Sequence, residues 1–444
     1  MERPLLAFDK HFYYEHPDVR AWPDAAVASW RRAHRVALRD RRAPKPVRTF
    51  LEAAFPPFLT APLEAAGFDR PTPVQSQAWP IILSGYDTIG LASTGSGKTL
   101  AFTLPALVHI VAQDYLAAGD GPIALMLAPT RELALQIKAE CDKFGGASGV
   151  RNTCVYGGVP KGPQLRDLQH GVEIAIATPG RLLDFLDAGQ TNLRRCTYLV
   201  LDEADRMLDL GFEPQLRQII ALIRADRQTL MFSATWPREV ERLAREFMSD
   251  AVMVEVNNAA DLTANENIEQ LFEVCEEAEK HARFLRVLQS VYDGSSRVII
   301  FCDTKRGCDA LRAELRRRGM AADSLHGDKT QQERDWVLLQ FKSGECPVLL
   351  ATDVAARGLD VKDVRVVINY DAPAQAEDYV HRIGRAGRAG ASGRAVTFVT
   401  PKDAPVAREL VHMMIKSRAA PPPRDLVHLA QTAAGDAVSS RRWR

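Results

Sequence analysis

Two short segments carry residue types that could bind a nucleotide and act on its phosphates. Residues 92–99 read ASTGSGKT, follow the apolar run Ile89–Ala92 and precede a helical pattern over 99–110. A strand, a glycine-bearing loop and the start of a helix bring backbone N–H groups together around phosphate oxygens. Lys98 would add a positive charge on the β- and γ-phosphates, and the Thr99 hydroxyl could ligate Mg²⁺.

The second segment is Asp202-Glu203-Ala204-Asp205, directly after the apolar run Tyr198–Leu201. It places carboxylates at the end of a second strand, where a metal–nucleotide complex needs them. Each segment has an alternative, a flexible turn for residues 95–97 and a solvated acidic helix start for residues 202–205. The first segment also departs from the pattern G-x-x-x-x-G-K-[ST], because Ala92 replaces its first glycine. The two segments together, in this order, indicate hydrolysis of a nucleoside triphosphate.

The composition is that of an ordinary globular protein and argues against several function classes. In 444 residues, 57 Lys and Arg stand against 56 Asp and Glu, so a net charge of +1 creates no global field for polyanions. No apolar run approaches the ~18 residues that cross a bilayer, and the N-terminus lacks the apolar core of a secretory signal. The seven cysteines are scattered without a C-x-x-C pair, which predicts reduced thiols in the nucleus, the cytoplasm or both, and no zinc site.

Short apolar runs alternate with helical patterns along most of the chain. Alternating strands and helices predict an α/β fold, in which a parallel sheet is covered by helices on both faces. The alternation restarts after the small, polar segment 258–267, which we interpret as a linker. The expected strands are 123–127, 172–177, 198–201 and 229–232 before the linker, and 298–301, 348–351, 364–368 and 395–399 after it.

This pattern predicts two domains flanked by extensions. We expect a first domain over 47–257 and a second of the same class over 268–416. Residues 1–46 form an aromatic and then basic extension, which is either an arm that contacts nucleic acid or an amphipathic segment packed on the first domain. The tail, 417–444, contains three consecutive prolines and is expected to be poorly ordered.

The second domain lacks a phosphate loop but has a basic, glycine-containing segment. Residues 381–388 read HRIGRAGR, with an arginine at every third position from 382. These arginines could complete a nucleotide site in the first domain, and an arginine finger contributes ~10³–10⁵ in rate, or ~4–7 kcal/mol. Closure of the domains would then be part of catalysis. The alternative is a loop that binds phosphate of any kind.

In the order of its segments the chain resembles the DEAD-box ATP-dependent RNA helicases, from about Phe50 to Phe398. Within that family it resembles the p-sixty-eight/Dbp-two subfamily most, on segments such as 151–160 (RNTCVYGGVP). The resemblance implies that Gln75 hydrogen-bonds the adenine edge, since an amide offers both a donor and an acceptor, and that Phe50 stacks on the ring. Taken alone, Phe50 would be an ordinary core aromatic.

The resemblance also implies roles for the catalytic and nucleotide-binding residues. Asp202, through water, and Thr99 would hold Mg²⁺, and Glu203 would orient or deprotonate the attacking water. From the second domain, His381 would bridge the cleft and the arginines would reach the γ-phosphate. The catalytic residues implied are Lys98, Asp202, Glu203, Arg357, His381, Arg385 and Arg388. The ATP-binding residues are Phe50, Gln75, Ser93, Thr94, Gly95, Ser96, Gly97, Lys98, Thr99 and Gly358, with Asp360 on the ribose.

A further set of segments resembles the family's RNA contacts. These segments offer short side chains, helix N-termini and backbone N–H groups, which contact phosphates and sugars and carry no base-sequence information. Singly, each is a common turn or helix start, and only the order of the set supports the interpretation. Ser233 and Thr235 resemble the element that couples hydrolysis to strand separation. The RNA-binding residues implied are Pro129, Thr130, Arg131, Gly157, Gly158, Thr178, Pro179, Gly180, Arg181, Thr304, Arg334 and Thr352.

These observations predict two tandem RecA-like α/β domains that form an ATP-dependent RNA helicase. We expect a monomer that uses ATP and Mg²⁺ to separate short RNA duplexes locally and to remodel ribonucleoprotein complexes, with ribonucleoprotein or ribosome-biogenesis partners. RNA, single-stranded or in short duplexes, would be recognised through its backbone and 2′-OH groups. Two alternatives stay open: an ATP-gated RNA clamp or scaffold whose turnover is incidental, and a DNA translocase.

Overall fold

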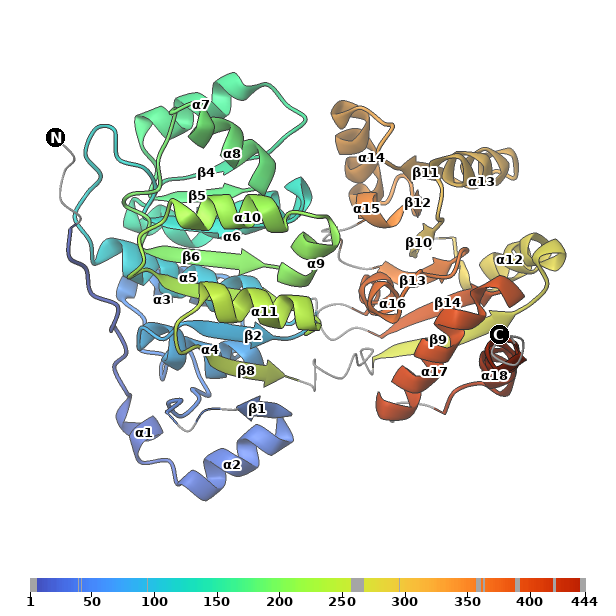
Figure 1. Cartoon of the computed structure of the whole chain (residues 1–444), viewed down its shortest axis with the longest axis horizontal. Helices are drawn as coiled ribbons and strands as arrows, with labels where there is room; N and C mark the ends of the chain where they lie inside the picture. Colours follow the sequence, from blue (N-terminus) through green and yellow to red (C-terminus); the bar gives the residue numbers. More distant parts are fainter. Residues whose placement is uncertain are drawn as a thin grey trace. The chain divides into compact units, whose positions relative to one another are not determined.

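The chain forms two compact units, Met1–Ala260 and Asp261–Arg444 (Figure 1). Within the described residues, no helix combines the length and the apolar character needed to cross a membrane. The linker predicted at 258–267 lies outside the described residues except for Asn267. The computed structural model describes residues 6–38, 40, 42–93, 95–256, 267–294, 296–356, 361, 364–387, 392–417 and 421–439.

The first unit is built on an eight-stranded sheet in the order β1-β8-β2-β7-β6-β3-β5-β4. Every neighbouring pair is parallel except β1–β8. Along β3, Ala124 and Met126 face one hydrophobic core while Leu125 and Leu127 face the other. Burial on both faces explains the continuous apolar runs in the sequence. The strands are β1 Val36–Leu38, β2 Thr88–Leu91, β3 Ala124–Leu127, β4 Asn152–Val155, β5 Ile174–Ala177, β6 Tyr198–Asp202, β7 Gln228–Ser233 and β8 Val252–Val256.

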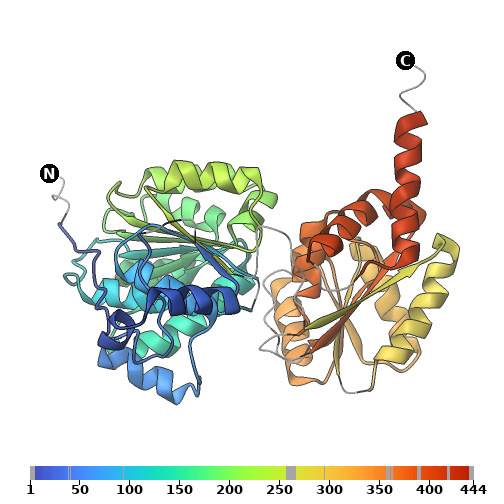
Figure 2. The same cartoon turned by 90° about the horizontal axis from the view of Figure 1, so that it is seen from below.

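Helices cover both faces of this sheet, as the sequence predicted (Figure 2). Helices α3 to α6 contribute to the core on one face, and α7 to α11 to the core on the other. The helices of the first unit are α1 Pro17–Arg20, α2 Asp24–Ala33, α3 Pro57–Ala65, α4 Pro73–Leu83, α5 Lys98–Val111, α6 Arg131–Gly145, α7 Lys161–His170, α8 Pro179–Asp187, α9 Ala204–Asp209, α10 Glu213–Ala221 and α11 Arg238–Phe247.

The N-terminal extension is packed on the first unit, which is the second of the two alternatives for residues 1–46. Strand β1 extends the sheet by pairing with β8. The buried side chains of Val19 and Val36 join the core, and the Phe12 backbone N–H donates to the Leu83 carbonyl at 2.6 Å. Among the described basic residues of the extension, Arg42 bonds to both Asp40 and Asp250.

The second unit repeats the architecture with a six-stranded, fully parallel sheet in the order β11-β12-β10-β13-β14-β9. The strands predicted by the sequence are confirmed to within two residues at each end. The strands are β9 Ile268–Val274, β10 Arg297–Phe301, β11 Ala322–Leu325, β12 Val348–Ala351, β13 Val364–Asn369 and β14 Gly393–Val399. The helices are α12 Glu277–Val291, α13 Lys305–Arg317, α14 Gln331–Ser343, α15 Asp353–Ala356, α16 Ala376–Ile383, α17 Ala404–Ser417 and α18 Arg424–Ser439.

The C-terminal tail differs from its sequence-based expectation. Residues 424–439, within the segment predicted to be poorly ordered, form helix α18. Leu426, Leu429 and Ala430 are buried and join the same core as Leu410 of α17. Their i, i+3, i+4 spacing gives the helix one apolar face, and packing of that face outweighs the nearby prolines, which only precede the helix.

Candidate active site and RNA interface

The predicted phosphate loop connects β2 to α5 at the carboxyl edge of the first sheet. Gly97 precedes the helix in a left-handed conformation (φ +93°), which favours glycine. The buried Lys98 ammonium donates to the Ala92 carbonyl at 2.7 Å, across the base of the loop. A bound phosphate would therefore compete with this carbonyl for the lysine. Ser93, Gly95, Ser96 and Thr99 lie in or beside the loop, whereas Thr94 is outside the described residues.

Gln75, the residue predicted to read adenine, joins the start of α4 to this loop. Its amide Nε2 donates to the Gly97 carbonyl at 3.0 Å, and its Oε1 accepts from the Thr72 backbone N–H at 3.0 Å. A Cβ on Gly97 would lie 2.5 Å from the Gln75 Nε2, so glycine is needed there for close approach as well as for φ. The half-buried Phe50 ring lies 5.9 Å from that of Trp79, whose indole N–H donates to the Leu100 carbonyl at 3.2 Å. Helix α4 thus connects both predicted adenine contacts to α5.

The acidic segment ends β6 and begins α9. Asp202 is buried, and its Oδ1 accepts the Glu203 backbone N–H at 3.0 Å. Burial raises the pKa of Asp202 to about 7, while the positive charge of Lys98 opposes this shift. Glu203 adopts a left-handed backbone (φ +54°), which is strained for a residue with a Cβ. This turn separates the two adjacent carboxylates, Asp202 in the strand and Glu203 in the connection to α9.

Asp205 was not selected as a site residue from the sequence, yet it connects two of the predicted elements. Its Oδ2 accepts from both the hydroxyl (2.8 Å) and the backbone N–H (3.0 Å) of Thr235. Its own backbone N–H donates to the Ser233 hydroxyl at 3.4 Å. All three residues are buried. The two residues expected to couple hydrolysis to strand separation therefore contact the acidic segment directly.

The predicted RNA-binding residues of the first unit follow β3, β5 and β4, which are neighbours in the sheet. Thr130 caps α6 by accepting the Leu133 backbone N–H at 3.3 Å, and Thr178 stands at the start of α8. After β4, a Cβ on Gly157 would meet no atom within 4 Å, so this turn borders open space. The remaining members of the set lie in the same three connections or in the first turns of the helices that follow: Pro129, Arg131, Gly158, Pro179, Gly180 and Arg181.

Two arginines of this set hold the connections in place. The Arg131 guanidinium lies 4.8 Å from the centre of the Tyr156 ring, directly after β4. Arg181 donates to the Val159 carbonyl at 3.1 and 3.2 Å, which ties α8 to the glycine turn. The predicted RNA residues thus lie in neighbouring connections, beside the predicted nucleotide residues after β2 and β6 and the predicted coupling residues at the end of β7.

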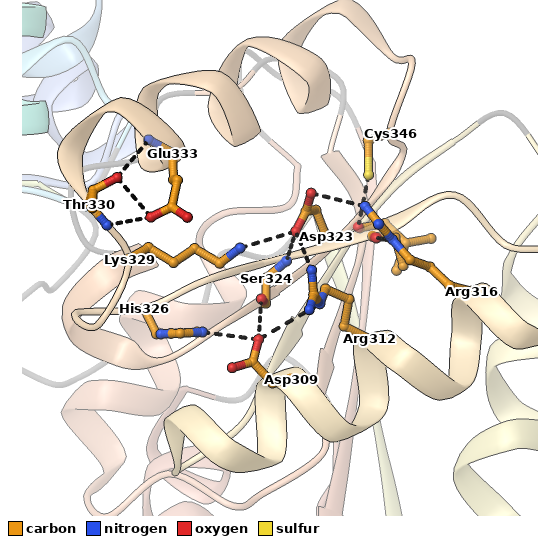
Figure 3. Close-up of polar contacts among 12 residues, drawn as sticks. Asp309, Arg312, Arg316, Asp323, Ser324, His326, Lys329, Thr330, Glu333 and Cys346 are labelled. Carbon is orange, nitrogen blue, oxygen red and sulfur yellow. Dashed lines mark hydrogen bonds and ion pairs between the residues drawn. The ribbon is translucent and has the colours of Figure 1, made fainter.

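The RNA residues predicted in the second unit also follow neighbouring strands, β11, β12 and β10. Thr304 caps α13 by accepting the Gly307 N–H at 3.0 Å, and Thr352 directly follows β12. Arg334 lies in the first turn of α14, whose start is fixed by a reciprocal cap between Thr330 and Glu333 (Figure 3).

Arg382 is a residue of the basic segment that received no role from the sequence. Its buried guanidinium forms two 2.6 Å bonds with the Asp353 carboxylate and one 2.7 Å bond with the Asp371 carbonyl. It thereby joins α16 to the end of β12. His381 and Arg385 flank it and are also buried. Arg357, Gly358, Asp360 and Arg388 lie outside the described residues.

Comparisons with known proteins agree with this arrangement. The family model described as DEAD/DEAH box helicase matches residues 72–243, and the helicase conserved C-terminal domain matches residues 279–390. The chain is 56% identical to ATP-dependent RNA helicase DBP2 of Pyricularia oryzae over 423 residues, which cover 95% of this chain and 77% of the relative. It is 54% identical to DEAD-box ATP-dependent RNA helicase 20 of Arabidopsis thaliana over 410 residues, 92% of this chain and 81% of that one.

Solved structures give the same result. The structure of Dbp5 from S. cerevisiae bound to RNA and ADP BeF3 superposes with a TM-score of 0.73 at 30% identity, covering 84% of this chain and 94% of that one. With relatives at more than half identity along nearly its whole length, the chain belongs to the DEAD-box family of ATP-dependent RNA helicases.

Proposed function

We propose that the first unit binds ATP at the ends of β2, β7 and β6, with RNA beside it at the ends of β3, β5 and β4. The observation that carries this proposal is that both residue sets lie on one edge of one sheet. In open α/β sheets, ligands bind outside the carboxyl ends of the strands. The helix N-termini at this edge favour the phosphates of both ligands.

The proposed catalytic roles follow from the chemistry of each group. Lys98 exchanges the Ala92 carbonyl for the phosphates of ATP, which stabilises their charge. Glu203, next to the buried Asp202 but outside the strand, orients or deprotonates the attacking water. Gln75 reads the adenine edge, and Phe50 stacks on the ring.

The residues present fit a magnesium ion. Burial disfavours the charged form of Asp202, as its raised pKa shows, so a cation at this carboxylate is favoured. Thr99, at the start of α5, offers a hydroxyl. Asp202 and Thr99 would hold Mg²⁺, which would neutralise charge on the β- and γ-phosphates.

The second unit would complete the site. Arg385 and Arg388 are proposed to reach the γ-phosphate, with His381 bridging the units, Arg357 ordering the site and Asp360 meeting the ribose. Arg382, held by Asp353, positions the helix that presents this segment. Because RNA would contact both units, its binding would favour the closed state and thereby stimulate hydrolysis.

RNA would be recognised through its backbone as single strands or short duplexes, because helix N-termini and caps carry no base code. We extend the proposal to a monomer that remodels ribonucleoprotein complexes in the nucleus, the cytoplasm or both. Its support is the likeness to ATP-dependent RNA helicases and to Dbp5 bound to RNA.

ATP affinity and RNA affinity, each measured for three variants, test the two ligand sites separately. Lys98→Ala should lose ATP binding and keep RNA binding. Gly157→Val should do the reverse, because its side chain enters the open space at the RNA surface. Gly146→Val is the matched control, since a Cβ at this position also meets no atom within 4 Å, but Gly146 follows α6 and precedes β4, at the opposite edge of the sheet. Equal loss of both ligands in Lys98→Ala and Gly157→Val would contradict two separate sites.

A further inference from the structure

Arg31, in helix α2 of the N-terminal extension, contacts the helix that carries Gln75. Its Nε donates to the Gln77 side-chain oxygen at 2.9 Å, and its Nη2 donates to the Pro44 carbonyl at 3.1 Å. Arg31 is half-buried, and this burial lowers the pKa of its guanidinium, which Asp24 partly offsets. A surface arginine that contacts RNA phosphates would have the opposite environment.

Gln77 is fully buried and completes a closed network with Arg31. Its Nε2 donates to the same Pro44 carbonyl at 2.9 Å, while its Oε1 accepts from Arg31. One residue earlier on α4, the Ser76 carbonyl accepts the Val47 backbone N–H at 2.9 Å. Two successive residues of α4, Ser76 and Gln77, thus hold the segment 44–47. Arg31 contacts both α4, at Gln77, and this segment, at the Pro44 carbonyl.

This network joins the two residues expected to recognise adenine. Gln75 directly precedes Ser76 and Gln77 on α4, and Phe50 follows Val47 by three residues. The contacts between α4 and 44–47 therefore set the position of Phe50 relative to Gln75. Because a recognised base must meet both residues at once, a small change in this position weakens recognition.

We propose that Arg31 is a positioning residue of the adenine site, through which the N-terminal extension determines selectivity for adenine nucleotides. The inference rests on the proposed roles of Gln75 and Phe50. Loss of the guanidinium leaves the buried Gln77 oxygen without its donor, and a buried polar group left unpaired is costly. We expect α4 or the segment 44–47 to shift so that the unpaired Gln77 oxygen finds another donor. This shift would loosen the adenine contacts and leave the phosphate loop unchanged.

Steady-state kinetics with ATP and GTP at saturating RNA test this inference on the full chain. Arg31→Met removes both donors and keeps much of the side-chain length, and Arg31→Lys keeps the charge without the forked geometry. The matched control is Arg32→Met, because the neighbouring Arg32 is exposed and its guanidinium donates to the Ser29 hydroxyl of the same helix at 2.9 Å. Gln75→Ala serves as the reference for lost adenine recognition.

For Arg31→Met we expect KM for ATP to rise about fivefold, from the loss of a buried hydrogen bond. The kcat for ATP and the KM for GTP should stay within about twofold, so the ATP/GTP selectivity falls by roughly the same fivefold. Arg31→Lys should be intermediate, and Arg32→Met should match the unchanged chain. If Arg31→Met fails to fold, the intermediate selectivity of Arg31→Lys carries the test.

Two results would overturn the inference, and they differ from failure of the proposed adenine site. Unchanged selectivity with a lower melting temperature in the Arg31 variants would leave Arg31 a purely stabilising residue. A parallel rise of KM for ATP and GTP would mean a general distortion of the site. If the unchanged chain and Gln75→Ala use ATP and GTP equally well, the adenine assignment itself fails, and the inference with it.

Discussion

Replacing Thr235 by valine tests the contact between the acidic segment and the end of β7. Valine keeps the shape of threonine and removes only the hydroxyl, whose 2.8 Å bond to the Asp205 Oδ2 is then lost. The backbone N–H of residue 235 still donates to the same oxygen at 3.0 Å. The Asp205 carboxylate therefore loses one of the two donors that Thr235 provides. The site is buried, since Asp205 and Thr235 are each 4% exposed.

The expected cost follows from that burial. A hydrogen bond to a charged group contributes about 1.5–3 kcal/mol, and little water is available to replace it. In a unit of this size, 1 kcal/mol corresponds to roughly 2–4 °C, so the first unit should melt about 3–12 °C lower. The second unit forms a separate compact body and provides an internal reference, because its own transition should not move.

The functional readout is the ratio of RNA strand separation to ATP turnover. We expect this ratio to fall in Thr235→Val, while Thr235→Ser, which keeps the hydroxyl, restores it. Thr229→Val is the matched control, since Thr229 is also buried in β7 and accepts a hydrogen bond from Arg227 at 3.1 Å, near the other end of the strand. If Thr229→Val lowers the ratio as much as Thr235→Val, the effect reflects general destabilisation and the coupling argument is refuted.

Three further predictions address catalysis, the extension and pH. Glu203→Gln should retain ATP and RNA binding but nearly abolish turnover, and hydrolysis within a few-fold of the unchanged chain would refute this role. Deletion of residues 1–46 should lower the melting temperature and leave the salt dependence of RNA affinity unchanged. A shallower slope of log affinity against log salt concentration would instead support the alternative that this extension contacts RNA. Burial lowers the pKa of His109 from 6.5 to about 3, so only the unfolded chain gains a proton between these values. The free energy of unfolding should therefore fall by about 2 kcal/mol as the pH is lowered from 7 to 5. Thermal unfolding of His109→Gln at the two pH values should not show this loss.

The elements that position the site were largely predictable because their signals are local. Fully buried parallel strands appear as apolar runs, which are unbroken in β3 and β5 and extend over Tyr198–Leu201 of β6 and residues 230–232 of β7. Helix starts are equally visible, since Thr130 and Thr304 each cap a helix with their own hydroxyl. Such residues identify the ends of strands without knowledge of the neighbouring strand.

Contacts that depend on strand order were not predictable. The bond between Asp205 and Thr235 exists because β6 and β7, separated by α9 and α10 in sequence, are neighbours in the sheet. The ion pair between Arg382 and Asp353 likewise joins elements after different strands. The environment of Arg31 was also hidden, because a basic stretch has the same sequence whether its arginines face water or a buried amide.

The strand order also explains how one sheet can serve two ligands. Strand β6 lies between β7, on the nucleotide side, and β3, the first strand on the RNA side. It is therefore the boundary between the two proposed sites, because its acidic segment contacts the predicted coupling residue Thr235 through Asp205, while its main chain pairs with β3. A rigid strand shared by both groups can transmit a displacement that a flexible loop would absorb. Under the proposed function, a change in the phosphates next to Asp202 would reach the RNA surface through the neighbouring strand, and the buried Asp205–Thr235 bonds would keep the ends of β6 and β7 from moving independently.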